Sequence, residues 1–182
     1  ILANDELCNG DNVNIQLTTV TVPYRGIEFN VDAVNNDPEI SGYTDRTGLV
    51  VSDIITESLT NSGDTARLVL YIISPVTLDI LGNQKCFGIN DTVEVWVNPT
   101  PRVIPVNEAT RICDQGITNI TLTSPTVMTS GVIEFNYAIT VTAPPAIVAG
   151  NRATAFSQPV GTQLQFNYTN ESDTMQSVFY RI

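Results

Sequence analysis

The sequence predicts an all-β chain of two tandem sandwich domains, the second of them incomplete. Three observations lead to this fold class: apolar and polar residues alternate in short runs, turn-forming residues separate the runs, and one long stretch of sequence occurs twice. The domains are expected at residues 1–101, as a complete repeat, and at residues 102–182, as a repeat that lacks its C-terminal strand.

The stretch that occurs twice lies at residues 7–30 and again at residues 112–136. It reads LCNGDNVNIQLTTVTVPYRGIEFN and then, about 105 residues further on, ICDQGITNITLTSPTVMTSGVIEFN. The match extends to Tyr71 and Tyr180, which lie in LVLYII and SVFYRI. The first repeat then continues through Cys86 and TVEVWVNP, for which the second repeat offers no counterpart. We therefore expect residues 1–182 to be an excerpt from a longer tandem array.

Strand positions in the first repeat follow from residue alternation. Segments with an apolar residue at every second position are predicted strands: 13–17, 27–31 and 92–98. The apolar run 66–73 is a predicted central strand, and 49–58 a predicted irregular strand that follows a loop over 39–48. Some seven short strands in about 100 residues, with turns and no convincing helix, are typical of an immunoglobulin-like β-sandwich.

The second repeat follows the same plan. Its expected strand positions are Ile120, Leu122, Ile133, Phe135, Tyr137, Ile139, Val141, Leu164, Phe166, Tyr168, Val178 and Tyr180, with Pro144 and Pro145 ending one strand. Without a closing strand, this repeat is expected to expose an apolar edge. The proline-rich stretch 98–107 between the repeats is a predicted extended linker, which favours a rod-like array.

Composition narrows the function classes. The net charge is −11, from 19 acidic and 8 basic residues, so a cationic face for nucleic acid or an anionic membrane is not expected. No apolar run is long enough for membrane insertion, and we do not expect the first residues, ILANDELC, to be a signal peptide. There is no histidine, which removes the commonest general base and the commonest zinc ligand. We expect no enzyme, no catalytic residues and no cofactor.

The three cysteines suggest an oxidising, extracellular setting. Cys8 and Cys86 each precede a strand of the complete repeat, and their disulfide is the expected staple of that domain. Cys113 is the counterpart of Cys8, and we expect it to be free because the chain stops before its partner. Two other readings stay open: a Cys86–Cys113 bridge, and three buried thiols.

A few residues are candidate ligand contacts. Acidic turns could hold calcium, although none has the spacing of a dedicated loop: Asp11, Asp37/Glu39, Asp45, Asp91 and Asp114. Trp96 faces outward by strand parity and could stack on a sugar or cover a neighbouring loop. Trp96 and the tyrosines Tyr24 and Tyr43, which we expect to be exposed, motivate the alternative function of a carbohydrate-binding accessory module of a secreted hydrolase. Paired acids at Asp37/Glu39 and Asp5/Glu6 are the weak basis for an enzyme.

The whole pattern resembles a known family. The motifs C-x-G-x-x-V-x-I-x-L, GIEF, NDPEISGYT and CFGINDTVEVWVNPTP look like the PKD-like repeats of giant surface adhesins of Bacteroidota, including those of gliding motility. The W-D-F-G-D-G signature of true PKD domains is absent. The resemblance implies export by the type IX system, display on the outer cell surface, and adhesion to polysaccharide or another substratum, with neighbouring repeats as further partners. It carries over no binding residue.

Overall fold

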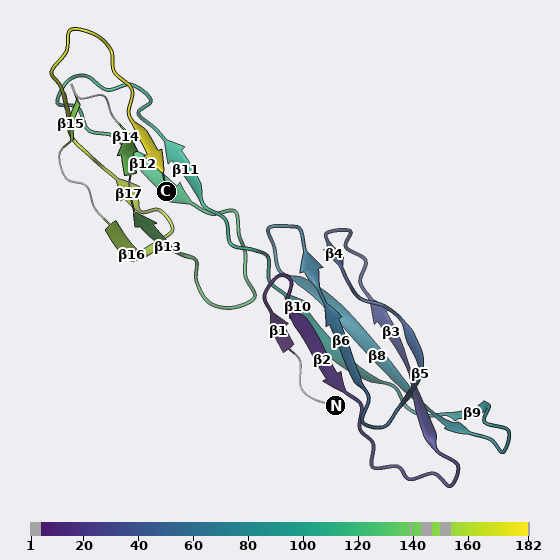
Figure 1. Cartoon of the computed structure of the whole chain (residues 1–182). Coiled ribbons are helices and arrows are strands. Elements are labelled where there is room, and N and C mark those ends of the chain that lie inside the picture. The colour runs from purple at the N-terminus through teal and green to yellow at the C-terminus, as the bar shows by residue number, and fades with distance from the viewer. Residues whose placement is uncertain (1–4, 139, 143–146, 150–153, 182) are drawn as a thin grey trace. The chain divides into compact units, whose positions relative to one another are not determined.

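The computed structural model of the chain describes residues 5–138, 140–142, 147–149 and 154–181 (Figure 1). All regular elements among these residues are β-strands, which confirms the all-β prediction. The chain forms two compact units. Unit 1 consists of Ile1–Thr100 and the short segment Val127–Ser130, and unit 2 consists of Pro101–Thr126 and Gly131–Ile182. The assignment of residues 127–130 to unit 1 was not foreseen from the sequence.

Unit 1 is a sandwich of two layers. One layer has the strand order β1-β10-β8-β3-β5, with β9 also paired to β8, and β1 runs parallel to β10. The other layer contains the antiparallel pairs β2-β6 and β4-β7. The strands are β1 (Asp5–Leu7), β2 (Asn12–Gln16), β3 (Ile27–Val34), β4 (Ile40–Ser41), β5 (Arg46–Val50), β6 (Ile54–Ser58), β7 (Thr60–Asn61), β8 (Arg67–Leu78), β9 (Gln84–Phe87) and β10 (Asp91–Val97).

The core of unit 1 follows the alternation seen in the sequence. Every second residue of β2 is buried, and so is every second residue of β10 from Val93 onward. The central strand β8 buries its residues Val69, Tyr71 and Ile73 against the other layer. Each such side chain contributes about 1.5–3 kcal/mol when it leaves water completely. The core cluster comprises Val13, Ile15, Leu17, Phe29, Val31, Ala33, Ile40, Ile55, Leu59, Val69, Tyr71, Ile73, Val93, Val95 and Val97.

Two predictions for unit 1 were wrong in detail. The expected loop over 39–48 contains β4 and most of β5, and the expected irregular strand over 49–58 is the end of β5, a turn and β6. The turn has Ser52 at φ 78°. β5 lies at the edge of its layer and has no alternating buried face, so its residues carry no period of two.

Unit 2 repeats this plan in the residues that the structure describes. Its strands are β11 (Ile104–Asn107), β12 (Ile120–Thr123), β13 (Glu134–Ala138), β14 (Thr140–Thr142), β15 (Ile147–Ala149), β16 (Thr154–Pro159), β17 (Gln163–Leu164), β18 (Tyr168–Asn170) and β19 (Phe179–Arg181). They pair as β11-β12-β17, β13-β16, β14-β19 and β15-β18. Part of the expected linker over 98–107 is therefore strand β11, because its residues pair with β12.

The predicted inward residues of unit 2 form its core. Ile120, Leu122, Phe135, Leu164, Phe166 and Tyr168 are buried, and Ile133, Tyr137, Val178 and Tyr180 pack against them. Ile139 and Pro144–Pro145, which the sequence placed in and after a strand, lie outside the described residues. Within the described part of the chain, no helix is long and apolar enough to cross a membrane.

Candidate functional site

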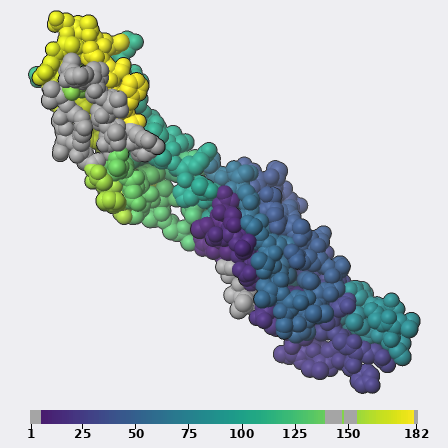
Figure 2. All heavy atoms as spheres, in the orientation of Figure 1, coloured from purple at the N-terminus to yellow at the C-terminus, as the bar shows by residue number. Residues whose placement is uncertain are grey.

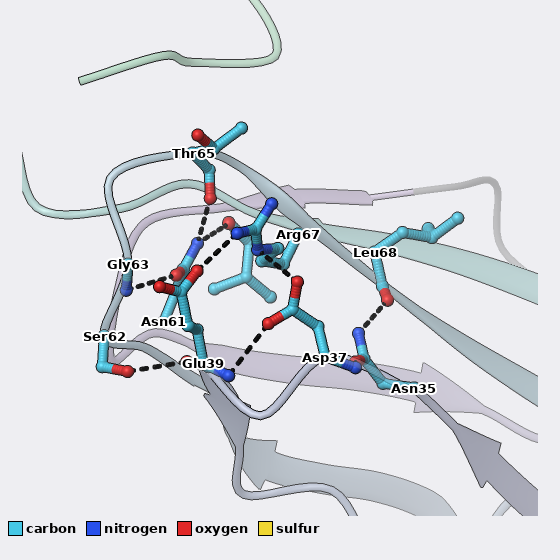
Figure 3. A network of polar contacts seen from close by, with 10 residues as sticks. Asn35, Asp37, Glu39, Asn61, Ser62, Gly63, Thr65, Arg67 and Leu68 are labelled. Carbon is cyan, nitrogen blue, oxygen red and sulfur yellow. Dashed lines mark hydrogen bonds and ion pairs between the residues drawn. The ribbon is translucent and has the colours of Figure 1, made fainter. Parts of the chain in front are cut away.

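The acidic pair Asp37/Glu39 is occupied by an arginine (Figure 3). Arg67, at the start of β8, pairs through Nε with Asp37 Oδ2 at 2.7 Å and through its terminal nitrogen with Glu39. The Asp37 carboxylate also accepts the backbone N–H of Glu39 at 2.9 Å. The hydrogen bond to Glu39 raises the pKa of Arg67, and the charge of Asp37 adds to this rise. The two acids therefore hold a protein cation in place.

The remaining acidic turns use their carboxylates to accept backbone N–H groups. Asp11 accepts from Cys8, Asp45 from Ala33, Asp91 from Thr92 and Asp114 from Asn170. This is ordinary turn chemistry. Among the described residues, no three Asp, Glu, Cys or His side chains gather as a metal site. Asp37 and Glu39 lie together on Arg67, and no third candidate acid of the described residues joins them.

A buried glutamate that the sequence analysis did not single out is the most enclosed charged group described. Glu57 on β6 is 7% exposed and accepts hydrogen bonds from Thr44, from the guanidinium of Arg46 at 3.0 and 3.1 Å, and from the hydroxyl of Tyr71 at 2.9 Å. Burial raises the pKa of the Tyr71 hydroxyl, and the hydrogen bond to Glu57 raises it further. Glu57 therefore fastens β8 to the opposite layer through polar contacts inside the core.

A second polar cluster surrounds Glu6 in unit 1. Its carboxylate accepts from Thr129 and Ser130, which belong to the segment Val127–Ser130, and from Asn98 Nδ2 at 2.7 Å. The hydrogen bond from Thr129, followed by those from Asn98 and Ser130, lowers the pKa of Glu6. The backbone of Val127 joins the same unit, since it bonds to Asp64 and Ala66 at 2.8 and 2.9 Å. Glu6 thus ties this segment to β1.

The aromatic candidates differ from one another in exposure. Trp96 lies on the outer face of its layer, between Glu6 of β1 and Leu68 of β8 in register, and is half-buried. Tyr24 is 95% exposed, with the Arg25 guanidinium 5.4 Å from its ring centre. Tyr43 was expected to be exposed, which is wrong: it packs against the core and donates its hydroxyl proton to the Asn35 carbonyl at 3.2 Å.

The cysteines are free and exposed, so the Cys8–Cys86 bridge expected from the sequence is absent from this fold. β8 explains why. Cys8 follows Leu7, which pairs with Val97, and Val97 lies opposite Arg67 at the start of β8. Cys86 lies opposite Thr77, near the other end of β8. At about 3.3 Å per residue, these two points of the strand are about 33 Å apart.

A disulfide needs Cα atoms about 5.5–6 Å apart, so Cys8 and Cys86 are far too distant. Figure 2 shows the teal segment around β9 at one end of unit 1, away from the purple segment of β1. Cys113 is exposed, and the expectation that it is free through truncation stays a prediction.

Comparison with known families agrees with this architecture. Residues 5–101 match the model of the PKD-like domain. The chain belongs to the PKD-like domain family. The matched PKD-like domain covers all the strands from β1 to β10. No curated protein matches the chain. A PKD-like domain fits a structural or adhesive module, and such domains are generally non-catalytic.

Proposed function

We propose that this chain is a structural and adhesive repeat module, without enzymatic activity, of a large secreted cell-surface adhesin that serves surface attachment and gliding motility. The proposal depends on what the two repeats share. They share buried core residues, namely Ile15, Leu17 and Phe29 in unit 1 and their counterparts Ile120, Leu122 and Phe135 in unit 2. They do not share the clusters around Glu57 and Arg67, because Phe166 and Gln176 stand at the places of these two residues.

This difference favours a module over a catalyst. A domain that is copied with its core and without its buried or paired charges extends an array, whereas a reaction requires the same groups in each working copy. The acidic surface and the PKD-like domain support the same proposal. The partners we propose are neighbouring repeats and a polysaccharide or other substratum, and the location is the outer cell surface, reached by type IX export. No cofactor and no calcium are part of the proposal.

An antibody against residues 1–182 tests location and role together in the cells that make the protein. We expect it to label intact cells and to slow their attachment and gliding, while a control antibody of the same isotype does neither. Labelling that requires permeabilised cells would contradict the outer-surface location. Surface labelling without any change in attachment or gliding would contradict the adhesive role. The repeats would then act only as a spacer.

The alternative, a carbohydrate-binding accessory module, is favoured by one observation, the almost complete exposure of Tyr24. An aromatic ring held in water can stack on a sugar. A glycan array tests it, with Tyr24→Ala and Trp96→Ala as the two variants. Binding lost in Tyr24→Ala would support the alternative, whereas an array without signal for the native chain would exclude it for the glycans tested.

A further inference from the structure

One outer face of unit 1 carries no charged side chain. It is formed by β2 and β6, which lie side by side as an antiparallel pair (Figure 1). Every second residue of the two strands points away from the core and is exposed, and none of these residues is charged. They form the amide face of unit 1: Asn12, Asn14, Gln16, Ile54, Thr56 and Ser58.

Unit 2 has the same kind of face, although it lacks the clusters around Glu57 and Arg67. The repeat and the strand register identify the same counterparts, because residues 117 and 121 pair with residues 167 and 163 as residues 12 and 16 pair with residues 58 and 54. The counterparts are exposed or half-buried and again uncharged. They form the amide face of unit 2: Ile117, Asn119, Thr121, Gln163, Gln165 and Asn167.

The opposite outer face of unit 1 is acidic by comparison. There, β3 and β10 direct Glu28, Asp32 and Glu94 away from the core. Glu6 of β1 lies on the same face, beside Trp96. A surface that serves solubility alone is expected to carry charges, and this chain has 19 acidic residues to place there. An uncharged face that recurs in both units therefore indicates a use other than solubility.

The amide face of unit 1 has free hydrogen-bonding capacity. Among the hydrogen bonds of the described residues, none involves the side chain of Asn12 or Gln16, while Asn14 accepts the hydroxyl proton of Thr56 at 3.2 Å. A carboxamide offers two donors and one acceptor oxygen. At about 3.3 Å per residue, the amides from Asn12 to Gln16 form a row about 13 Å long.

Unit 2 offers similar capacity on its own face. Gln163 and Gln165 bond to each other at 3.3 Å, which leaves further donors and acceptors on both side chains. Among the described residues, the side chain of Asn167 makes no hydrogen bond. Asn119 differs, because its amide donates to Glu108 at 2.6 Å. The glutamines and Asn167 are therefore the free amides of unit 2.

Charge complementarity selects the occupant of these faces. A phosphate, sulfate or carboxylate would meet no cation on either amide face, and a cationic ligand would find its counter-charges on the acidic face instead. A sugar chain without charge fits, because each of its hydroxyls can both donate and accept, as the amides and hydroxyls of the face do. Neutral groups also leave water at a smaller cost than ions. A straight row, in place of a pocket, suits an extended polymer.

We propose that the amide faces bind a neutral, linear polysaccharide, which lies along β2 in unit 1 and along β12 in unit 2 and is held by hydrogen bonds to carboxamide and hydroxyl groups. Each unit is a separate site for such a chain. The proposal rests on the adhesive function proposed above, and it adds to that function a ligand class and the residues that bind it.

Affinity electrophoresis of the whole chain tests the ligand class. Native gels that contain hydroxyethylcellulose or glucomannan, which are neutral and linear, should retard the chain relative to serum albumin. Gels that contain the anionic polymer alginate should not retard it. Absence of retardation by both neutral polymers would overturn the proposal, and so would equal retardation by alginate.

Isosteric variants test the faces. Asn12→Asp with Gln16→Glu changes unit 1, and Gln163→Glu with Asn167→Asp changes unit 2. Each change removes a donor and adds a charge that binding would have to desolvate, while it keeps the shape and the acceptor. Each pair should remove the contribution of its own unit, and the variant with all four changes should show no retardation.

A matched control adds the same charge elsewhere. Asn36→Asp with Asn90→Asp alters two exposed loop residues outside both faces, and this variant should bind as the native chain does. Thermal unfolding followed by circular dichroism shows whether each variant is folded. A control variant that loses retardation would show that net charge, and not the amide face, governs binding.

The outcomes separate this proposal from the adhesive function. Full retardation of the variant with all four changes would overturn the amide faces and leave adhesion to polysaccharide in place, and retardation lost only in Tyr24→Ala would favour the accessory-module alternative. Native chains that self-associate in sedimentation without binding either polymer, while the variant with all four changes stays monomeric, would make the faces contacts between copies and overturn the proposal. Adhesion itself is tested separately, by the antibody on intact cells.

Discussion

Units 1 and 2 share a plan but differ in how deeply equivalent side chains such as Tyr71 and Tyr180 are buried. In unit 1, one continuous layer runs from β1 through β10, β8 and β3 to β5. Among the described residues of unit 2, the equivalent strands β13 and β14 pair with β16 and β19. Core residues of the two units nevertheless correspond where the repeat aligns them. Ile15 pairs with Ile55 in unit 1, and their counterparts Ile120 and Leu164 pair with each other in unit 2.

The difference teaches that the shared core residues define the fold. In unit 1, β10 and the buried Glu57 add further contacts to that core. Tyr71 and Tyr180 illustrate this. The hydroxyl of Tyr71 donates to a buried carboxylate, whereas that of Tyr180 donates to the hydroxyl of Tyr168 at 2.9 Å in a half-buried place. The same residue type in the same place of the repeat therefore stabilises the two units to different degrees.

The largest effect is expected from truncation in the closed core. Ile55→Ala should destabilise unit 1 by about 4 kcal/mol and Leu164→Ala should destabilise unit 2 by about 2 kcal/mol, because a more open core relaxes around the cavity. Denaturant unfolding followed by NMR signals from each unit measures both values. Equal losses would contradict the view that the core of unit 2 is the less enclosed one.

Removal of the buried carboxylate should come next. Glu57→Ala leaves Tyr71 and Arg46 without their acceptor and should cost unit 1 about 3 kcal/mol, at the low end for a broken buried pair because Arg46 can still reach water. Glu134→Ala is the control, since this exposed acid lies on a strand of unit 2. A loss below about 1 kcal/mol for Glu57→Ala would mean that water takes the place of the carboxylate as the acceptor for Tyr71 and Arg46.

The two tyrosines provide a smaller, paired test. Tyr71→Phe should cost unit 1 about 1.5 kcal/mol, since its partner is charged, and Tyr180→Phe should cost unit 2 about 0.5 kcal/mol. The raised pKa of Tyr71 adds a pH signature. The neutral hydroxyl is favoured in the folded state, so its contribution is complete below the ordinary tyrosine pKa of about 10 and declines as the pH rises above it.

Tyr71→Phe should therefore remove part of the alkaline loss of stability in unit 1. Unfolding curves between pH 7 and pH 11 measure this. An unchanged alkaline decline in Tyr71→Phe would show that this hydroxyl does not cause it.

The smallest effect concerns Glu6. A ¹³C titration of its carboxyl should give a pKa below the ordinary glutamate value, and Thr129→Val should raise the pKa by removing its first hydrogen-bond donor. A lowered pKa stabilises unit 1 above the ordinary value, and this contribution is lost as the pH falls through the folded-state pKa. The pKa of Asp79, which is lowered by backbone N–H groups of Asn83 and Leu81, is the reference and should not change. A Glu6 pKa that stays the same in Thr129→Val would exclude the contact.

The sequence predicted the parts of the fold that depend on alternation. Val93, Val95 and Val97 are buried as expected, and so are Leu164, Phe166 and Tyr168. Glu57 was missed although its signal was present, because the strand parity of Ile55 and Leu59 places residue 57 inward as well. An acid at an inward position predicts a buried hydrogen-bond partner. Tyr71, at an inward position of the predicted central strand, carries a hydroxyl that can serve as that partner.

Other features had no local signal. Cys8 and Cys86 precede or lie in strands of different direction, so their place along the chain does not say at which end of the sandwich each lies. The pairing of Asp37 and Glu39 with Arg67 joins residues that are far apart in the sequence, and only the register of the strands brings them together. The kinship with adhesins of gliding bacteria stays a prediction, whereas the PKD-like domain is confirmed.

The segment Val127–Ser130 has a practical consequence for how the protein is divided. By descent, these residues belong to the second repeat, but by contact they belong to unit 1, where they meet Glu6, Asp64 and Ala66. A fragment cut at residue 101, where the family match ends, would carry Glu6 without two of its donors.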